Sequence, residues 1–287
     1  MSYKVVFFGD SLSDNGKICR STGSGKLWSE IFPDLIGASV IENYAKCGAN
    51  TNHLTEQIED YRKQTMPKDN ILYDWFFKKQ QTDIVVYSLL IGGNDFLTLN
   101  PFYIFWNIEN SIKELNQISD GNKKHFLVFD LPSFSNVPVA SNIGGKLLNA
   151  ITPAASKISK YYHTILPESL SYGLDFTLSN MGKLTIEKGV NLLSSLLLNT
   201  VGFLYSYKMN NLVEKLQLFE YSVTKINLDD FYKNVGANLT ANGFSEDLQC
   251  LTSSGCKAGL FYDEIHPSAH SHQLLAEYVA ASYNEAF

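Results

Sequence analysis

The chain has little charge, and the balance of that charge is acidic. Only 18% of its 287 residues are charged, and the formal net charge is −6. An acidic surface does not attract nucleic acid or a strongly anionic bilayer, because both carry negative charge. We therefore expect no nucleic-acid partner, and we expect any binding to a lipid to be hydrophobic.

Uninterrupted apolar runs of membrane-spanning length are missing. The apolar stretch 190–205 is short and contains Asn191, Ser194, Ser195, Asn199 and Thr200. These polar residues argue against a transmembrane helix. The N-terminus also lacks the charged region and cleavage site of a secretory signal peptide before its first apolar run.

Motifs of other enzyme classes are absent. Segment 23–26, Gly-Ser-Gly-Lys, lacks the spacing of a phosphate-binding loop, and no Gly-x-Ser-x-Gly nucleophile elbow is present. Cys250 and Cys256 have no His or further Cys nearby at the spacing of zinc ligands. We expect His270 and His272 to cap the last helix or to face solvent. The sequence therefore predicts neither a metal nor a cofactor.

Four cysteines are present. Cys250 and Cys256 flank a short, turn-rich loop that can close as a disulfide in an oxidising compartment, and we predict this bridge. Cys19 and Cys47 follow the first two predicted strands. These two residues are either a second pair or free thiols.

A serine nucleophile is predicted where the first buried strand ends. Gly-Asp-Ser-Leu at 9–12 directly follows the apolar run 5–8. A serine hydroxyl needs a base within hydrogen-bond reach, and the base needs a third group to orient it. His266 and Asp263 supply both from one tight loop. Each segment alone is an ordinary turn, but together they predict a triad of Ser11, His266 and Asp263.

The oxyanion that forms after attack on an acyl group requires preorganised hydrogen-bond donors. Segment 91–95, Ile-Gly-Gly-Asn-Asp, offers the side-chain amide of Asn94. The backbone N–H groups of Ser11 and Gly48 are the other two predicted donors.

These segments resemble the sequence blocks of the GDSL, or SGNH, hydrolases. The blocks appear here at 8–16, 43–49, 92–95 and 261–268, so the likeness spans almost the whole chain. The resemblance implies the roles given above to the triad and to the three oxyanion donors.

A branch within that family is also indicated. The long first block, the Asp-Leu-Pro element at 130–132 and the cysteines before the last block resemble the branch of bacterial secreted lysophospholipases A and glycerophospholipid:cholesterol acyltransferases, with the secreted lysophospholipases A the nearest likeness. Tyr262 departs from the pattern, because many relatives carry Trp there. The resemblance implies a secreted or periplasmic protein whose signal peptide is absent from this sequence, whereas the N-terminus as it stands implies a cytoplasmic one.

Alternating strand and helix patterns predict a three-layer α/β/α sandwich in a single domain spanning 1–287. Predicted strands cover 4–8, 39–43, 83–90, 125–131 and 219–228, and predicted helices cover 27–36, 51–64, 108–119, 208–218 and 269–283. Sites in such folds form at the carboxyl ends of the strands. The family resemblance adds a flavodoxin-like, five-stranded parallel sheet of order 2-1-3-4-5. A helical insert is predicted at about 139–207.

Two apolar segments are candidates for a substrate groove. One is the aromatic cluster with Phe102, Phe105 and Trp106, and the other is the insert run with Leu196 and Leu197. Aromatic clusters commonly belong to a core. The alternative, which we favour, is a wall and a lid for an acyl chain.

Three functions are compatible with the sequence. The first is hydrolysis of lysophospholipid or phospholipid with transient contact to a membrane surface, accompanied by minor phospholipase A or acyltransferase activity. The second is an esterase for acetylated carbohydrates or small soluble esters. The third is a non-catalytic lipid-binding module. The complete triad argues against the third, and the apolar segments favour the first over the second.

Overall fold

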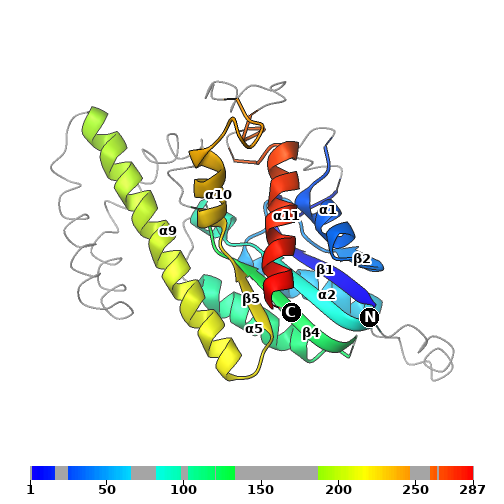
Figure 1. Cartoon of the computed structure of the whole chain (residues 1–287). Coiled ribbons are helices and arrows are strands. Elements are labelled where there is room, and N and C mark those ends of the chain that lie inside the picture. The colour runs from blue at the N-terminus through cyan, green and yellow to red at the C-terminus, as the bar shows by residue number, and fades with distance from the viewer. Residues whose placement is uncertain are drawn as a thin grey trace, which may run out of the picture. The chain divides into compact units, whose positions relative to one another are not determined.

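The computed structural model describes residues 2–16, 25–65, 82–97, 103–119, 121–132, 187–245, 259–263 and 265–286, with the backbone alone for 121–122 and 187–201. Strands and helices alternate along these residues (Figure 1). The strands are β1 (Tyr3–Gly9), β2 (Val40–Asn43), β3 (Thr82–Leu90), β4 (Gly121–Phe129) and β5 (Val223–Ile226). The helices are α1 (Trp28–Leu35), η1 (Thr51–His53), α2 (Leu54–Thr65), α4 (Gly93–Leu97), α5 (Ile104–Asn116), α9 (Glu187–Leu218), α10 (Leu228–Ala237) and α11 (Ala269–Ala286).

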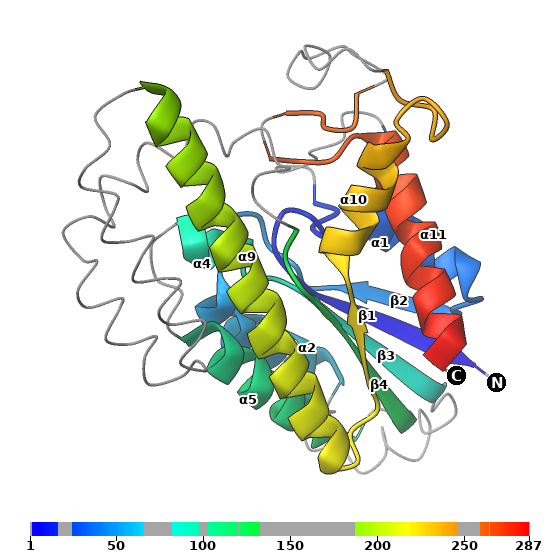
Figure 2. The ribbon, with the colours of Figure 1, turned by 60° about the vertical axis from the view of Figure 1, so that its left-hand side comes forward.

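The five strands form one parallel sheet in the order β2-β1-β3-β4-β5 (Figure 2). This arrangement confirms the predicted fold class and strand order. β1 and β3 pair in register from Tyr3 opposite Ile84 to Gly9 opposite Leu90. The two strands therefore end side by side, and the loops that follow them meet at the carboxyl edge of the sheet.

Helices cover both faces of the sheet, and the alternation of side chains along β1 shows how (Figure 2). Phe7 points to the face covered by α1 and α11, where the ring of Trp28 contacts Phe7 at 5.3 Å and Phe129 at 5.1 Å between centroids. Phe8 points to the opposite face, where Tyr61 of α2 packs edge-on at 5.7 Å. Burial on both faces explains why the strands read as continuous apolar runs.

The chain divides into two compact units, and each is described by itself. The first consists of Met1–Leu131 and Tyr207–Phe287 and contains the whole sheet, and the second is Pro132–Ser206. Helix α9 begins in the second unit and ends in the first. A single domain with an insert at about 139–207 stays a prediction. Among the helices of the described residues, none has the length and hydropathy to cross a membrane.

The predicted strand 219–228 is wrong in its extent. β5 has only four residues, and α10, which the sequence patterns missed, begins directly after it at Leu228. The side chain of Asn227 caps α10 by accepting the N–H of Asp230, and the buried carboxylate of Asp130 accepts the N–H of Leu228 at 2.7 Å. These polar contacts end the strand, whereas the apolar pattern alone continues through the boundary.

Candidate active site

Ser11 stands on a tight turn at the carboxyl end of β1. That strand ends at Gly9, which has a φ of +150° and lies so near β3 that an added Cβ would be 2.2 Å from the carbonyl oxygen of Leu90. Only glycine fits such an approach. The carbonyl of Asp10 then accepts the N–H of Ser13 at 3.1 Å, which turns the chain sharply. The hydroxyl of Ser11 therefore lies where the strands end, with the residue 9% exposed.

A buried amide from α2 fixes the start of this turn. Gln57 is fully buried, its Oε1 accepts the N–H of Gly9 at 2.9 Å, and its Nε2 donates to the carbonyl of Gly9 at 2.8 Å. Buried backbone N–H and carbonyl groups must be hydrogen-bonded. Gln57 therefore provides hydrogen-bond partners for the backbone of Gly9 at the end of β1. Sequence reasoning missed this residue, although a Gln within the buried stripe of a helix is a detectable signal.

Asp263 and His266 lie in one short loop before α11. An antiparallel bridge between Phe261 and Pro267 closes the base of this loop, and the N–H of Tyr262 donates to the carbonyl of His266 at 2.8 Å. Asp263 Oδ1 accepts the backbone N–H of His266 at 2.7 Å. The two side chains therefore meet on the same side of a compact loop.

Ser11, His266 and Asp263 form a continuous chain of hydrogen bonds. His266 Nε2 lies 2.9 Å from Ser11 Oγ, and His266 Nδ1 lies 2.7 Å from Asp263 Oδ2. Partial burial acts to raise the pKa of Asp263, but the backbone N–H groups and the imidazole that donate to it hold the pKa below its usual value. An ionised Asp263 keeps the proton of the imidazole on Nδ1, which leaves Nε2 as the acceptor for the serine hydroxyl.

The three predicted oxyanion donors lie in the segments that follow three neighbouring strands, and Asn94 belongs to the short helix α4. Ser11 follows β1, Gly48 follows β2 and Asn94 follows β3. The side-chain Nδ2 of Asn94 donates to the carbonyl of Ala49 at 2.9 Å, which ties the loop after β3 to the residue beside Gly48. Gly48 has a φ of +72°, in the left-handed region that favours glycine.

Two buried carboxyl groups, which sequence reasoning did not select, accompany the nucleophile turn. Asp10 is 4% exposed and Asp95 is 2% exposed. Burial raises the pKa of Asp10 to about 7, the N–H of Leu12 opposes this shift, and the charge of Asp95 adds to it. Burial also raises the pKa of Asp95, against the hydrogen bonds that Thr51 donates. With a pKa of about 7, Asp10 changes from a neutral carboxyl group to a carboxylate as the pH rises through neutrality.

Asp10→Asn should change how stability depends on pH. Because the pKa of Asp10 is raised from 3.8 to about 7 by folding, the wild-type protein loses stability as the pH rises through that window. The neutral Asn variant lacks this loss. The difference in the free energy of unfolding between variant and wild type should therefore increase in favour of the variant, by on the order of 2 kcal/mol between about pH 5 and about pH 8. The difference is measured by denaturant unfolding of both proteins at a series of pH values across this range.

The comparison between these two proteins reports the titration of Asp10 together with its coupling to Asp95, and the buried histidines contribute to both proteins alike. Burial lowers the pKa of His125 to about 4, so its contribution to stability is lost as the pH falls, the opposite direction. A stability difference that stays constant across the pH range would contradict the prediction.

The expectation that His270 and His272 cap the last helix or face solvent is wrong for His272. This residue is fully buried, its Nδ1 accepts the N–H of Trp28 at 3.3 Å, and burial lowers its pKa to about 3. The reason is that α11 packs against α1 from its first turn. His270 is half-buried, with Nε2 at 2.6 Å from the carbonyl oxygen of Asn242. Nowhere in the described part of the chain do three His, Cys, Asp or Glu side chains gather as metal ligands.

The predicted groove residues are described only in part. Trp106 is 64% exposed and Phe105 is half-buried on α5. Phe102 and the side chains of Leu196 and Leu197 lie outside the described residues. The groove therefore stays a prediction.

The predicted bridge between Cys250 and Cys256 also stays a prediction, because both residues lie outside the described ranges, as Cys19 does. Cys47 is described and is disulfide-bonded. Of the two alternatives left open for Cys47, the free thiol is therefore excluded.

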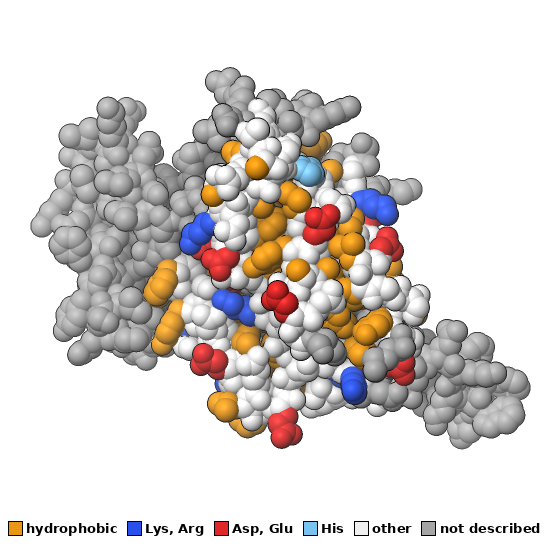
Figure 3. Space-filling view, in the orientation of Figure 1, with side chains coloured by type: hydrophobic (Ala, Val, Ile, Leu, Met, Phe, Trp, Pro, Cys, Tyr) orange, Lys and Arg blue, Asp and Glu red, His pale blue; other side chains and the backbone are white. Residues whose placement is uncertain are grey.

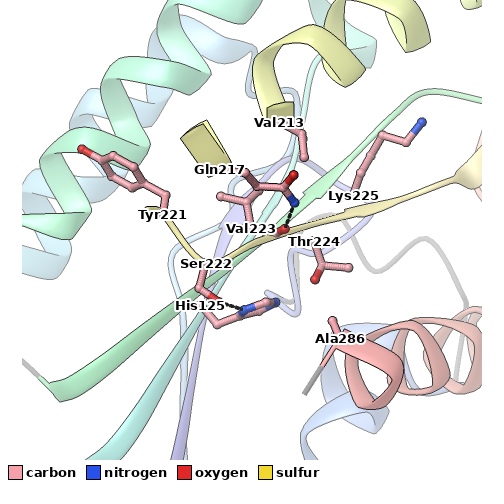
Figure 4. A pocket seen from close by; sticks show the side chains of 9 residues that line it. All are labelled: His125, Val213, Gln217, Tyr221, Ser222, Val223, Thr224, Lys225 and Ala286. Carbon is pink, nitrogen blue, oxygen red and sulfur yellow. Dashed lines mark hydrogen bonds between the residues drawn. The ribbon is translucent and has the colours of Figure 1, made fainter. Parts of the chain in front are cut away.

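A pocket of ≈ 460 Å³ lies along the edge strand β5 and contains no triad residue. Its lining residues are His125, Val213, Gln217, Tyr221, Ser222, Val223, Thr224, Lys225 and Ala286 (Figure 4). Gln217 donates to the carbonyl of Val223 at 3.0 Å, and His125 Nδ1 lies 2.7 Å from Ser222 Oγ. The contact of Gln217 covers part of the edge strand β5, and the contact of His125 joins β4 to the start of β5. Among the described residues on the face shown in Figure 3, acidic and basic side chains lie interspersed, without a patch of one sign.

Comparison with known proteins places this geometry in context. A family model described as GDSL-like Lipase/Acylhydrolase matches residues 5–279. The chain is similar to a phosphatidylcholine-sterol acyltransferase of Aeromonas hydrophila, with 25% identity over 99% of this chain and 90% of that protein. It is also similar to the secreted effector protein SseJ of Salmonella typhimurium, with 23% identity over 47% of this chain and 36% of that protein.

Solved structures show a more distant likeness. Phospholipase A1 from Streptomyces albidoflavus matches with a TM-score of 0.47 and 12% identity, over 100% of both chains. A protein from Slackia heliotrinireducens, described as an SGNH hydrolase, matches with a TM-score of 0.42 and 10% identity, over 99% of this chain and 100% of that one.

Proposed function

Because the chain belongs to the family of GDSL-like lipases and acylhydrolases, we propose that it is a serine carboxyl-ester hydrolase that releases fatty acid from lysophospholipids. The observation that carries the proposal is the hydrogen-bonded chain from Ser11 through His266 to Asp263. Family membership implies an ester hydrolase with such a triad, and the lysophospholipid substrate is the further step that we propose.

The geometry supports a two-step mechanism. Ser11 Oγ attacks the ester carbonyl while His266 Nε2 takes the hydroxyl proton, and Asp263 stabilises the imidazolium. The carbonyl oxygen becomes an oxyanion, which the predicted donors stabilise. The C–O bond then breaks, His266 returns the proton to the leaving glycerol oxygen, and an acyl-enzyme remains. Water, activated by the same imidazole, releases the fatty acid and restores Ser11.

Two observations favour a lipid acyl group over an acetylated sugar. The relative that matches over almost the whole chain is named a phosphatidylcholine-sterol acyltransferase. Tyr103, which precedes α5, is 60% exposed, and Trp106 in the first turn of α5 is 64% exposed. In the same turn Asn107 donates to Thr51 at 3.0 Å and to Asn52 at 3.1 Å, so the start of this helix is joined to the segment that follows Gly48. Exposed aromatics next to a reaction centre offer apolar surface to an acyl chain.

Minor phospholipase A and acyltransferase activities belong to the same proposal. An alcohol can replace water at the acyl-enzyme, with His266 accepting its proton, if the site excludes enough water. We also propose a secreted or periplasmic location, supported by the name of the Salmonella relative, a secreted effector protein.

A substrate panel tests the proposal. The purified protein is assayed on lysophosphatidylcholine, diacyl phosphatidylcholine, a short-chain nitrophenyl ester and an acetylated sugar. We expect the highest kcat/KM on lysophosphatidylcholine. Preferential hydrolysis of the acetylated sugar would instead identify a carbohydrate esterase, and binding of lipid without turnover would identify a non-catalytic module.

Trp106→Ala should lower kcat/KM for long-chain lysophosphatidylcholine about tenfold, because contact with an indole buries a large apolar area of the chain. Turnover of the short nitrophenyl ester and the melting temperature should stay unchanged, since the side chain is 64% exposed. Phe219→Ala is the matched control, because Phe219 is 67% exposed and lies before β5, away from the carboxyl edge. Equal losses on both substrates would show that Trp106 does not contact the acyl chain.

A further inference from the structure

Thr51 and Asp95 form a buried clamp between η1 and α4 at the carboxyl edge of the sheet. Thr51 is 1% exposed and Asp95 is 2% exposed. The backbone N–H of Thr51 donates to Asp95 Oδ2 at 3.0 Å, and its hydroxyl donates to Asp95 Oδ1 at 2.6 Å. One carboxyl group therefore holds both the main chain and the side chain of Thr51.

The clamp is extended by α5. Asn107 Nδ2 donates to the hydroxyl oxygen of Thr51 at 3.0 Å and to Asn52 Oδ1 at 3.1 Å. The hydroxyl of Thr51 therefore accepts a hydrogen bond from Asn107 and donates one to Asp95. These two hydrogen bonds together fix the orientation of the Thr51 side chain. In a buried setting such linked hydrogen bonds strengthen one another.

The clamp lies three residues after Gly48, and contacts before and after Gly48 hold the rest of this loop. Before it, the N–H of Cys47 donates to Asp14 Oδ2 at 2.8 Å, which ties the loop to the nucleophile turn. After it, the carbonyl of Ala49 accepts the Asn94 amide at 2.9 Å. Asn94 and the Asp95 of the clamp are adjacent, so neighbouring side chains of α4 hold residues 49 and 51.

Gly48 lies in a turn that the N–H of Ala49 closes by donating to the carbonyl of Lys46 at 3.0 Å. The residue is exposed, has a φ of +72°, and a Cβ added to it would meet no atom of the described residues within 4 Å. The direction of its N–H therefore depends on how this turn and the residues on either side of it are held. An oxyanion donor has to be held in place before the reaction, because reorganisation during the reaction costs rate.

We propose that Thr51 is a positioning residue: held by Asp95 and by α5, it sets the direction in which the Gly48 N–H points in the oxyanion hole. The inference rests on the proposed ester-hydrolase function. It goes beyond that function because Thr51 touches neither the substrate nor the triad and acts through the loop.

Thr51→Val tests the clamp, because valine keeps the shape and the backbone N–H but removes the hydroxyl. On a short-chain nitrophenyl ester, we expect kcat per active site to fall about tenfold with KM within about twofold of wild type. Active sites are counted by titration with a fluorophosphonate, so that a loss of folded protein does not imitate a loss of rate. Binding of phenylboronic acid, which forms a tetrahedral adduct with a serine, should weaken by a similar factor.

Two further variants separate positioning from packing. Thr51→Ser restores the hydroxyl without the methyl group and should recover most of the rate. Thr65→Val is the matched control, because the Thr65 hydroxyl donates to the carbonyl of Tyr61 at 2.9 Å near the end of α2, and its loss should leave kcat unchanged. Should Thr51→Val be poorly folded, Asn107→Ala removes the donor from α5 and should lower kcat about threefold.

The outcomes distinguish failure of the positioning role from failure of the proposed function. Unchanged kcat and unchanged boronic-acid affinity in Thr51→Val would overturn the positioning role, and so would a rate that Thr51→Ser does not recover. A wild-type protein that hydrolyses the nitrophenyl ester but not lysophosphatidylcholine would overturn the proposed substrate and leave the positioning role supported or refuted by the variants. A wild-type protein that neither hydrolyses any ester nor binds the boronic acid would overturn both.

Discussion

Ser11→Ala should abolish ester turnover, with a loss of about 10⁴-fold or more, and leave the fold intact. The hydroxyl oxygen of Ser11 is the atom that faces His266 Nε2 at 2.9 Å, and the substitution removes the oxygen that forms the acyl-enzyme. The residue lies at a turn where a single oxygen contributes little packing. Steady-state rates on a nitrophenyl ester and on lysophosphatidylcholine, together with the melting temperature, measure both effects.

The same turn provides a matched control. Ser13 is fully buried, and within the described residues its hydroxyl makes no hydrogen bond. Ser13→Ala should therefore retain wild-type turnover and should not lower the melting temperature. Ester turnover in folded Ser11→Ala at the wild-type rate would reject the triad.

Asn94→Ala should lower kcat by about 10²–10³ with little change in KM. Its amide is proposed to bind an oxygen that carries negative charge only in the transition state. The structure adds a second reason for the loss, because the same amide holds the carbonyl of Ala49 beside Gly48. The loss of kcat should therefore be at least as large as the loss from removing an oxyanion donor that holds no other part of the site.

Kinetics on a soluble ester distinguish this role from simple substrate binding. Asn242→Ala is the control, since the Asn242 amide donates to the carbonyls of Val235 and Asn238 after α10 and its loss should leave kcat unchanged. A raised KM with an intact kcat in Asn94→Ala would assign the amide to the substrate ground state instead. Thr51→Val should give a smaller loss than Asn94→Ala, because it displaces one donor and removes none.

The chemistry of this site was predictable because it depends on short-range patterns. A turn after an apolar run predicts Ser11 at a strand end, and a three-residue spacing lets one loop present Asp263 and His266 together. The alternation of apolar strand runs and helical periodicity likewise predicts a parallel sheet with its site at the carboxyl edge. Each of these inferences needs only residues that are close in sequence, and the resemblance to a known family joins them.

Boundaries and burial were less predictable. The end of β5 depends on polar capping by Asn227 and on the distant carboxylate of Asp130, which an apolar pattern does not register. His272 reads as a polar residue at the start of a helix, but α11 packs against α1 there and buries it completely. Which face of a helix is covered depends on its neighbours, and these are set by the whole fold.

The sequence by itself predicted the fold class, which the structure confirms, and it predicted the order of the proposed triad along the chain and the ester hydrolysis that we propose. Only the tertiary structure decided which buried polar groups hold the reacting parts in place: Gln57 on Gly9, and Asp95 on Thr51. The physical reason is that a buried polar side chain must find a partner wherever the fold brings one. Gly9 lies 48 positions from Gln57, and Thr51 lies 44 positions from Asp95, so no local periodicity links the members of either pair.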